Sequence, residues 1–230
     1  ALDIEYALIE GIKRFQTGLL AKANRGYLYI DEVNLLEDHL VDLLLDVAQS
    51  GENVVEREGL SIRHASKFIL IGSGNPEEGE LRPQLLDRFG LSVEVMTPDT
   101  VHERIEIIQR RDQYDNNPEG YVLDWQKENK KLRNKIQKAR KNLNSVSVDN
   151  KILENCAEIC IDLGSDGLRG ELTLVRTARA LAALSNSSSV DQAQLRKIAP
   201  MALSHRLRRD PLDDAGSGTR VARSVEKIIG

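Results

Sequence analysis

The first half of the chain alternates short apolar runs with longer amphipathic segments. Three β-prone apolar runs predict buried strands, because strands covered on both faces read as continuous apolar stretches; they span residues 26–30, 67–72 and 91–95. Residues 38–48 place leucine and valine around a broad helical face. Residues 53–56 and 60–63 predict a hairpin turned by Gly59. Helices alternating with apolar strands predict a parallel sheet with helices on both faces.

From residue 99 onward the strand pattern disappears and helical periodicity replaces it. Residues 100–113 predict a helix, and an Asn-Pro break follows at residues 115–118. Residues 124–141 are mostly charged and polar, which predicts an exposed helix or connector. Apolar residues at helical spacing predict three further helices, at residues 149–163, 168–185 and 191–207. The chain is therefore predicted to have an α/β part followed by an all-helical part.

The composition is that of an ordinary soluble globular protein, with 40% hydrophobic and 30% charged residues. The net charge of −4 disfavours a nucleic-acid-binding surface, for which a basic balance is expected. No apolar run approaches the ~18 residues needed to cross a bilayer. Cys156 and Cys160 lie four residues apart among apolar neighbours, which favours core thiols on one helix over a disulfide or a metal site. So few cysteines suit a reducing compartment.

Two acidic residues end the first apolar run. Asp31 and Glu32 directly follow residues 26–30, at the carboxyl end of a predicted buried strand. Open α/β sheets bind ligands at this edge, and paired carboxylates are costly there unless they have a role. In P-loop ATPases the first acid of such a pair holds Mg²⁺, directly or through water, and the second polarises the attacking water. The alternative is that both acids only cap the helix that follows.

Two further polar residues follow in an order that suits nucleotide chemistry. Asn75 lies just past the second predicted strand, where an amide can reach a γ-phosphate or orient water. The alternative for Asn75 is an Asn-Pro turn. Arg88 ends a short helix, from which it can point into a neighbouring subunit's nucleotide site as an arginine finger. The alternative for Arg88 is a solvated side chain paired with Asp87.

Arg169 opens the strongly helical segment 168–185. The helix dipole opposes a cation in the first turn, so a phosphate ligand would explain this arginine better than a structural role. Each of these features is weak alone. Together they form an ordered set that indicates ATP hydrolysis: an acid pair, an asparagine, an arginine and a second arginine in a helical region.

The ordered set resembles the AAA+ superfamily of ring-forming ATPases. By this resemblance Asp31 and Glu32 match the Walker B acids, and Asn75 matches sensor 1. Arg88 matches the arginine finger and Arg169 matches sensor 2. Whether Arg169 acts on its own nucleotide or on a neighbour's is left open.

Longer stretches are similar to one family within this superfamily, the I subunits of magnesium chelatase. They read GLLAKANRGYLYIDEVNLLEDHLVDLLLDVAQSGENVVEREG, GSGNPEEGELRPQLLDRFG and DGLRGELTLVRTARALAAL, with the basic HRLRRDPLD near the end. The hairpin predicted at residues 53–63 also resembles the AAA+ clade with a pre-sensor-1 hairpin. That clade includes chelatases, MoxR-type ATPases and MCM helicases.

The resemblance implies an α/β fold with an AAA+ P-loop-type parallel sheet that lacks its first strands, followed by an all-helical lid domain. Residues 1–98 would form the C-terminal portion of the nucleotide-binding domain, residues 99–148 a helical connector, and residues 149–230 the lid with sensor 2. The implied cofactors are ATP and Mg²⁺, with Asp31 as the protein's ligand to the ion of MgATP.

The resemblance also implies an activity and partners. In this family, MgATP hydrolysis in a homo-oligomeric, hexameric ring drives insertion of Mg²⁺ into protoporphyrin IX for chlorophyll or bacteriochlorophyll synthesis. The implied partners are an AAA-like chelatase subunit with an integrin I domain and a large porphyrin-binding subunit, without nucleic acid or a membrane span. The implied location is the cytoplasm of a photosynthetic bacterium, with the plastid stroma as the alternative.

One expected motif does not occur in the sequence. No G-x-x-x-x-G-K-[ST] loop is present, although its backbone and lysine would be needed to hold the phosphates of ATP. We therefore interpret the sequence as the later portion of a longer protein; the alternative is an ATPase-dead paralogue. The other functions left open are a MoxR-like chaperone for another metalloenzyme, an MCM-like DNA-remodelling ATPase and a non-catalytic ring scaffold.

Overall fold

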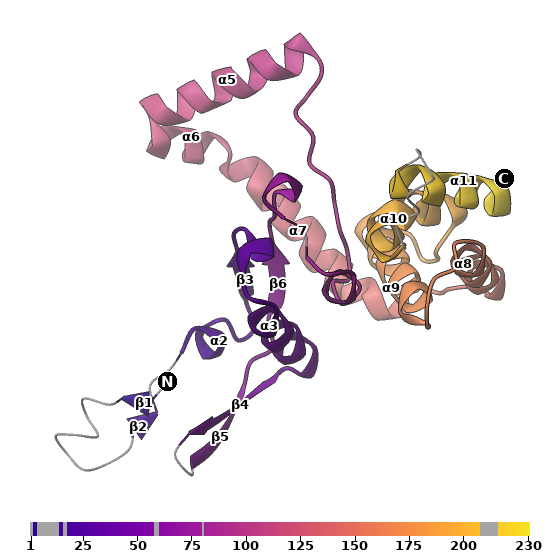
Figure 1. The fold of residues 1–230 in the computed structure, drawn as a ribbon. Helices are drawn as coiled ribbons and strands as arrows, with labels where there is room; N and C mark the ends of the chain where they lie inside the picture. The colour runs from indigo at the N-terminus through magenta and orange to yellow at the C-terminus, as the bar shows by residue number, and fades with distance from the viewer. Residues whose placement is uncertain (1, 4–13, 16–17, 58–59, 80, 208–215) are drawn as a thin grey trace. The chain divides into compact units, whose positions relative to one another are not determined.

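The computed structural model describes residues 2–3, 14–15, 18–57, 60–79, 81–207 and 216–230 (Figure 1). They form two compact units, Ala1–Phe89 and Gly90–Gly230. The first unit contains strands and helices, and the second contains helices alone among its described residues. This confirms the predicted α/β part with a parallel sheet followed by a helical lid. The finer division into three domains stays a prediction.

The first unit is built around two parallel strands and one helix. Strands β3 (Tyr27–Ile30) and β6 (Ile69–Gly72) pair in register from Tyr27 beside Ile69 to Ile30 beside Gly72. Helix α3 (Asp38–Ser50) packs its apolar side against one face of this pair; the buried residues of the two adjoining clusters are Ala23, Leu28, Val33, Val41, Leu45, Val47, Phe68, Leu81 and Leu85. Gly51 ends α3 at a φ of 75°, a left-handed conformation that favours glycine.

The opposite face of the strand pair differs from the prediction. Both strands were expected to be buried on both faces, but Tyr27 is 70% exposed and Ile69 is 57% exposed. Tyr29 and Ile71 point the same way and are also exposed, because side chains alternate along a strand. Helix α3 therefore covers one face, and no second layer covers the other among the described residues.

The expected third strand at residues 91–95 is also wrong. The structure assigns no strand there, and Val93 and Val95 are exposed. Ser92 instead donates its backbone N–H to the carbonyl of Met201 at 2.8 Å. The apolar pattern is β-prone, but a strand also needs a neighbouring strand to pair with, and no ladder partner for it occurs in the described part of the chain.

Short elements complete the first unit. Strands β4 (Glu52–Arg57) and β5 (Leu60–Ala65) form the predicted hairpin, although its turn residue Gly59 lies outside the described residues. Strands β1 (Leu2–Asp3) and β2 (Arg14–Phe15) pair antiparallel. The short helices are α2 (Leu19–Lys22), η1 (Val33–Leu35), η2 (Pro76–Glu78) and α4 (Pro83–Leu86).

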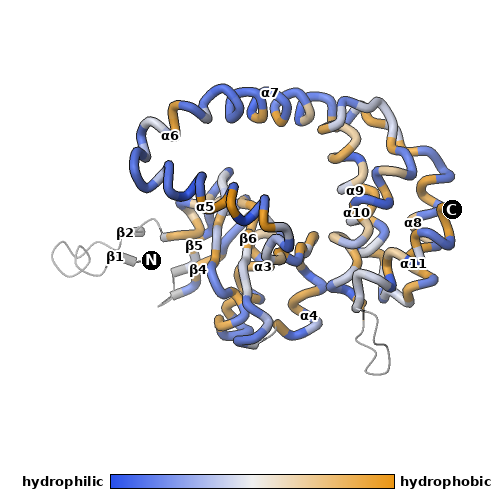
Figure 2. The backbone as a smooth tube through the Cα atoms, turned by 90° about the horizontal axis from the view of Figure 1, so that it is seen from above, coloured by the Kyte–Doolittle hydropathy of each residue, from blue (hydrophilic) through white to orange (hydrophobic). Residues whose placement is uncertain are grey.

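The second unit begins with three hydrophilic helices. Helix α5 (Val101–Asn116) is capped by the Thr100 hydroxyl, which accepts from the N–H of Glu103. Helices α6 (Pro118–Asp124) and α7 (Gln126–Asn142) follow. Figure 2 shows these helices as mainly hydrophilic, and Ala139 is the buried residue of α7. The predicted exposed helix or connector over residues 124–141 is confirmed as an exposed helix.

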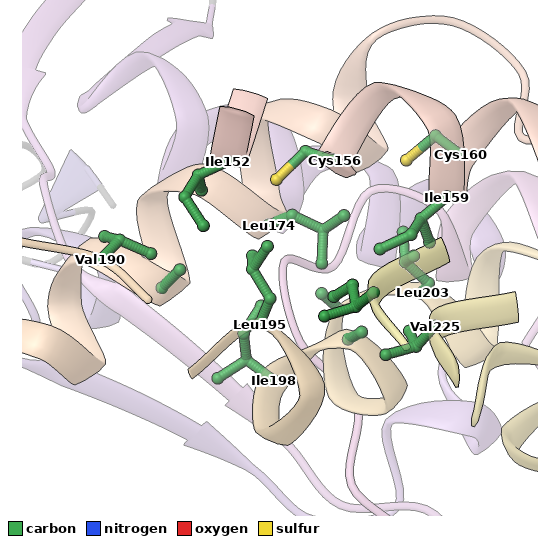
Figure 3. Packing of buried hydrophobic residues seen from close by; sticks show 14 of the residues in the cluster. Ile152, Cys156, Ile159, Cys160, Leu174, Val190, Leu195, Ile198, Leu203 and Val225 are labelled. Carbon is green, nitrogen blue, oxygen red and sulfur yellow. The ribbon is translucent and has the colours of Figure 1, made fainter. Parts of the chain in front are cut away.

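The remaining helices enclose the largest hydrophobic cluster among the described residues. They are α8 (Asn150–Asp162), α9 (Arg169–Leu184), α10 (Gln192–Leu203) and α11 (Ser217–Ile229), with η3 (Leu143–Ser145) and η4 (Ser204–Arg206) at the connections. In Figure 3 side chains from α8, α9, α10 and α11 converge, and Ile159, Leu174, Leu195 and Leu203 are fully buried. Across the described residues, no helix has the length and apolar character needed to span a membrane.

Candidate functional site

The two acidic residues lie at the carboxyl edge of the parallel strand pair. Because Ile30 lies beside Gly72, the next residues of the two strands, Asp31 and Ser73, also lie side by side. The N–H of Ser73 donates to the carbonyl of Ile30 at 3.0 Å, and the carbonyl of Ser73 accepts from Val33 at 2.8 Å. The backbone therefore holds the two strand ends together at the edge where open α/β sheets bind ligands.

The carboxylate of Asp31 accepts two side-chain hydrogen bonds on the same oxygen. Ser73 donates its hydroxyl to Oδ1, and the phenol of Tyr29 is 2.9 Å from that oxygen. These bonds lower the pKa of Asp31 below its ordinary value, because they favour the charged form; the Ser73 bond has the largest effect and the Tyr29 bond follows. Asp31 is thus held as an anion at an exposed strand end.

Glu32 has an unusual backbone conformation. Its φ of 51° and ψ of 50° lie in the left-handed region, which side chains other than glycine rarely adopt. Its N–H donates to Ser73 Oγ at 3.2 Å, and its side chain is exposed. Glu32 precedes η1, but its carboxylate makes no capping bond to that helix. The geometry of Glu32 therefore gives no support to the helix-capping alternative.

Asn75 lies two residues beyond Ser73 at the same edge. Its side-chain oxygen accepts from the N–H of Glu77 at 3.1 Å and caps η2, as the turn alternative expected. Its carbonyl accepts from Nδ2 of Asn34, which ties this loop to the one after the acid pair. The amide nitrogen of Asn75 has no hydrogen bond within the described part of the chain, so capping and a role toward a ligand are compatible.

Arg88 lies on α4's carboxyl side and contacts α3. Its Nη1 donates to Asp42 at 2.7 Å, and its Nη2 bonds Asp46. The two aspartates are one helical turn apart on α3, and the Arg88 side chain is only 19% exposed. The alternative weighed from the sequence was pairing with Asp87, but Arg88's ion pairs run to Asp42 and Asp46. Its role as a finger stays a prediction.

Arg169 belongs to the second unit and is the first residue of α9. It is exposed, and its carbonyl accepts from the Thr173 hydroxyl at 2.7 Å. The start of α9 is closely packed, since a Cβ at Gly170 would be 3.1 Å from Cys160 Sγ. The helix position predicted for Arg169 is therefore confirmed, whereas its role as sensor 2 stays a prediction.

The residues at the strand edge fit the magnesium ion of a nucleotide. Mg²⁺ prefers hard oxygen ligands, and nucleotide sites supply one or two carboxylates plus the substrate's phosphates. Asp31 offers an exposed, ionised carboxylate, and Glu32 lies next to it. No group of three or more metal-binding side chains occurs among the described residues, so an all-protein metal cage is not present there.

Sequence reasoning missed Ser73 and Tyr29. Ser73 follows β6 just as Asp31 follows β3, so a parallel in-register pairing would have placed the two together. Tyr29 precedes Asp31 by two residues and thus lies on the same face of the strand. The contact of Ser73 depends on the register between β3 and β6, which the sequence pattern does not specify, whereas that of Tyr29 lies within one strand.

A parallel strand pair with two acids at its carboxyl edge, joined to a helical lid, defines an AAA+ ATPase fold. In agreement, residues 153–228 match the AAA lid domain family, and residues 4–84 match the family described as magnesium chelatase, subunit ChlI. The chain is 64% identical to the magnesium-chelatase 38 kDa subunits of Rhodobacter capsulatus and Cereibacter sphaeroides, over its whole length. It belongs to this magnesium-chelatase subunit family.

A plant relative agrees with this assignment, and a solved structure agrees with the fold. The chloroplastic magnesium-chelatase subunit ChlI of Nicotiana tabacum is 51% identical over 99% of the chain and is covered over 54% of its own length. The crystal structure of a candidate ATPase from Cytophaga hutchinsonii shares the fold, with a TM-score of 0.66 at 17% identity over 89% of this chain and 66% of that one. The chain spans 65% of the Rhodobacter subunit and 69% of the Cereibacter subunit.

Proposed function

We propose that the protein containing this chain is the ATPase motor subunit of magnesium chelatase. It hydrolyses MgATP in an oligomeric ring, and the resulting conformational cycle drives insertion of the substrate Mg²⁺ into protoporphyrin IX. The observation that supports this most is the Asp31–Glu32 pair at the edge of β3, held by Ser73 of the neighbouring strand. The 64% identity to named chelatase subunits favours this function over a MoxR-like chaperone or an MCM-like DNA-remodelling ATPase.

The two acids at the strand edge have different roles. Asp31 stays ionised and offers an oxygen to the magnesium ion or to a water bound to it. Glu32 accepts a hydrogen bond from the attacking water and polarises it. Asn75 orients the same water or contacts the γ-phosphate through its amide nitrogen. When bound, MgATP supplies the phosphoryl group and the cation that neutralises its charge.

The two arginines act at a longer range. Arg88 serves the nucleotide of a neighbouring subunit, where a second cation stabilises charge that develops on the transferring phosphoryl group. To do so it exchanges Asp42 and Asp46 for phosphate oxygens. Arg169, at the amino end of α9, senses the γ-phosphate and couples the nucleotide state to the lid. A phosphate there also offsets the unfavourable interaction of a cation with the helix dipole.

The remaining parts of the proposal concern the assembly. The ring is a homo-oligomer, in which Arg88 and the acid pair come from different copies. A second AAA-like subunit with an integrin I domain and a large porphyrin-binding subunit are its partners. The cytoplasm of a photosynthetic bacterium is the proposed location, in keeping with bacterial relatives at 64% identity against 51% for the chloroplastic ones.

The substitution Glu32→Gln tests this function in the full-length protein. It should slow ATP hydrolysis by about 10²-fold or more, because an amide cannot polarise the water, while nucleotide binding persists through Asp31. Magnesium insertion with the two partner subunits should fall in parallel. The measurements are steady-state phosphate release, binding of a fluorescent ATP analogue, and formation of magnesium protoporphyrin.

Glu37→Gln is the matched control, because Glu37 is an exposed glutamate on the same stretch that pairs with His39 outside the strand edge. It should leave all three measurements unchanged. Normal turnover by Glu32→Gln in an assembled ring would remove Glu32 from the reaction. Phosphate release without magnesium insertion, in the parent with both partners present, would leave an ATPase with a different target.

A further inference from the structure

Ser73 contacts the acid pair through its side chain as well as joining the two strand ends through its backbone. Its backbone is fixed on both sides, by the carbonyl of Ile30 and the N–H of Val33. Its hydroxyl is therefore presented at a defined place beside Asp31. A serine in this position can both donate and accept, because a hydroxyl has one proton and two lone pairs.

The Ser73 hydroxyl holds both acids at once. It donates to Oδ1 of Asp31 and accepts from the N–H of Glu32 at 3.2 Å. Because Glu32 adopts a left-handed conformation with φ 51° and ψ 50°, its backbone needs local interactions to stay there. The bond from Glu32 N–H to Ser73 Oγ is such an interaction, and it fixes the point from which the Glu32 side chain departs.

Tyr29 completes the arrangement from the exposed face of β3. Its phenol oxygen is 2.9 Å from Oδ1 of Asp31 and 3.2 Å from Oγ of Ser73. Two hydroxyl groups thus converge on one oxygen of the carboxylate. The second oxygen, Oδ2, receives no side-chain hydrogen bond from the residues that the structure describes. The carboxylate is therefore oriented through Oδ1, and no side-chain bond at Oδ2 competes with a ligand there.

We propose that Ser73, supported by Tyr29, is a positioning residue of the magnesium–nucleotide site: it engages Oδ1 of Asp31 so that Oδ2 serves the ion or its bound water. This inference rests on the proposed function. Its physical basis is general, since partners that hydrogen-bond a metal-binding carboxylate orient that ligand and raise metal affinity. Both hydroxyls bond Asp31, and that of Ser73 also bonds Glu32, so in this proposal their effect passes through the acid pair.

The test is the magnesium dependence of nucleotide binding by the full-length protein. A fluorescent, non-hydrolysable ATP analogue is titrated in saturating Mg²⁺ and again in EDTA. For each variant the dissociation constant in EDTA is divided by the dissociation constant in Mg²⁺, and this ratio measures the magnesium dependence. Ser73→Ala should reduce this ratio by about tenfold, because Asp31 loses its strongest orienting bond. The affinity in EDTA should stay unchanged, and Ser73→Thr, which keeps the hydroxyl, should restore the ratio.

Tyr29→Phe and Tyr27→Phe provide a matched pair for the second hydroxyl. Both tyrosines lie on the exposed face of β3, but Tyr27 makes no side-chain hydrogen bond within the described part of the chain. Tyr29→Phe should lower the magnesium dependence several-fold, about as expected for a hydrogen bond to a charged group. Tyr27→Phe should leave it unchanged. If Ser73→Ala does not fold, the two tyrosine variants test the proposal. Equal magnesium dependence of nucleotide binding in Tyr29→Phe and Tyr27→Phe overturns it.

Two other outcomes also decide the matter. If Ser73→Ala keeps the parent's magnesium dependence, or loses affinity equally in Mg²⁺ and in EDTA, Ser73 has a structural role only and the inference is wrong. That result leaves the proposed function intact, because the parent still binds MgATP. If the parent itself binds the analogue equally well in Mg²⁺ and in EDTA, the proposed function fails at its first step.

Discussion

Two thiols in the lid core show what burial does to a reactive group. Cys156 and Cys160 are free, and each is about 1% exposed on α8. Burial, and after it the negative charge of Glu171, raise the pKa of Cys156 to about 11 and that of Cys160 to about 12. Since the thiolate is the reactive form, both side chains should be inert in the native protein. The prediction of core thiols from their helical spacing is confirmed.

We predict slow alkylation and a loss of lid stability at high pH. At pH 8 iodoacetamide should modify the peptide containing both cysteines at least about a hundredfold more slowly than in urea-unfolded protein. The folded lid favours the protonated thiols, so this contribution to stability is complete below about pH 9 and decreases as the pH rises toward 11 and 12. Mass spectrometry and urea unfolding would measure these effects. Native alkylation at the unfolded rate would contradict the buried placement.

At the residue scale, the sequence predicted positions better than contacts. Asp31 and Glu32 were placed correctly because an apolar run ending in acids fixes where a strand stops. The bonds from Ser73 to Asp31 join residues 42 positions apart, and those from Arg88 to α3 join residues 46 and 42 positions apart. Such pairs depend on strand register and helix packing, which a local pattern does not contain. The ion pair of Arg88 with Asp42 was therefore not foreseen.

Helix α9 is closely packed near its amino end. Gly170 is buried, and a Cβ there would lie 3.1 Å from Cys160 Sγ, 3.1 Å from Ser165 Oγ and 3.3 Å from Leu203 Cδ2. Those distances leave no room for a branched side chain, although a helix otherwise favours almost any residue over glycine. Close approach to α8 and α10 therefore explains the glycine.

We predict that Gly170→Val lowers the free energy of unfolding by about 1–3 kcal/mol, because overpacking forces neighbouring side chains out of place. The control is Gly218→Val in α11, where the nearest atom to a new Cβ is Ser204 Oγ at 3.8 Å. This change should be neutral or slightly stabilising. Urea denaturation of the two full-length variants measures the difference. Equal stability of both would show that α8, α9 and α10 do not approach as closely as described.

At the element scale, the helices were predicted well and the strands less well. The lid helices have apolar residues at helical spacing, which is a local property, and α10 also begins with a capping box formed by Asp191 and Gln194. A strand instead depends on a partner distant in sequence. Residues 91–95 have the composition of a strand, yet the described residues supply no neighbour for them, and the segment has no regular secondary structure.

At the scale of the whole molecule, the residues proposed to act on the nucleotide are divided between the two units. The acid pair, Asn75 and Arg88 belong to the first unit, and Arg169 belongs to the second. Within the first unit Arg88 is bound to Asp42 and Asp46, whereas the acid pair is held by Ser73. The ion pairs of Arg88 among the described residues therefore run to α3 and not to Asp31 or Glu32 of the same subunit. This arrangement agrees with a role for Arg88 at a neighbouring copy.

Mixing two inactive variants tests that role directly. Arg88→Ala should reduce hydrolysis by about 10³-fold or more, as the loss of an arginine finger does in GTPases, and Glu32→Gln should reduce it as well. In a mixed ring, some interfaces combine Arg88 from a Glu32→Gln subunit with Glu32 from an Arg88→Ala subunit. With equal, random mixing about a quarter of the interfaces are complete, so up to about a quarter of the parent's rate should return.

The control is a mixture of either variant with a subunit that has both changes. Such rings contain no interface with Arg88 on one side and Glu32 on the other side, so hydrolysis should stay low. Size-exclusion chromatography with differently labelled subunits must show that the copies exchange. If co-assembled single variants regain no activity, Arg88 does not act at a neighbouring copy's nucleotide, because a shared site between copies would have been rebuilt by mixing. The ion pairs with Asp42 and Asp46 would then be the whole role of Arg88, and its loss would affect stability by about 1 kcal/mol or less, as expected for partly exposed pairs.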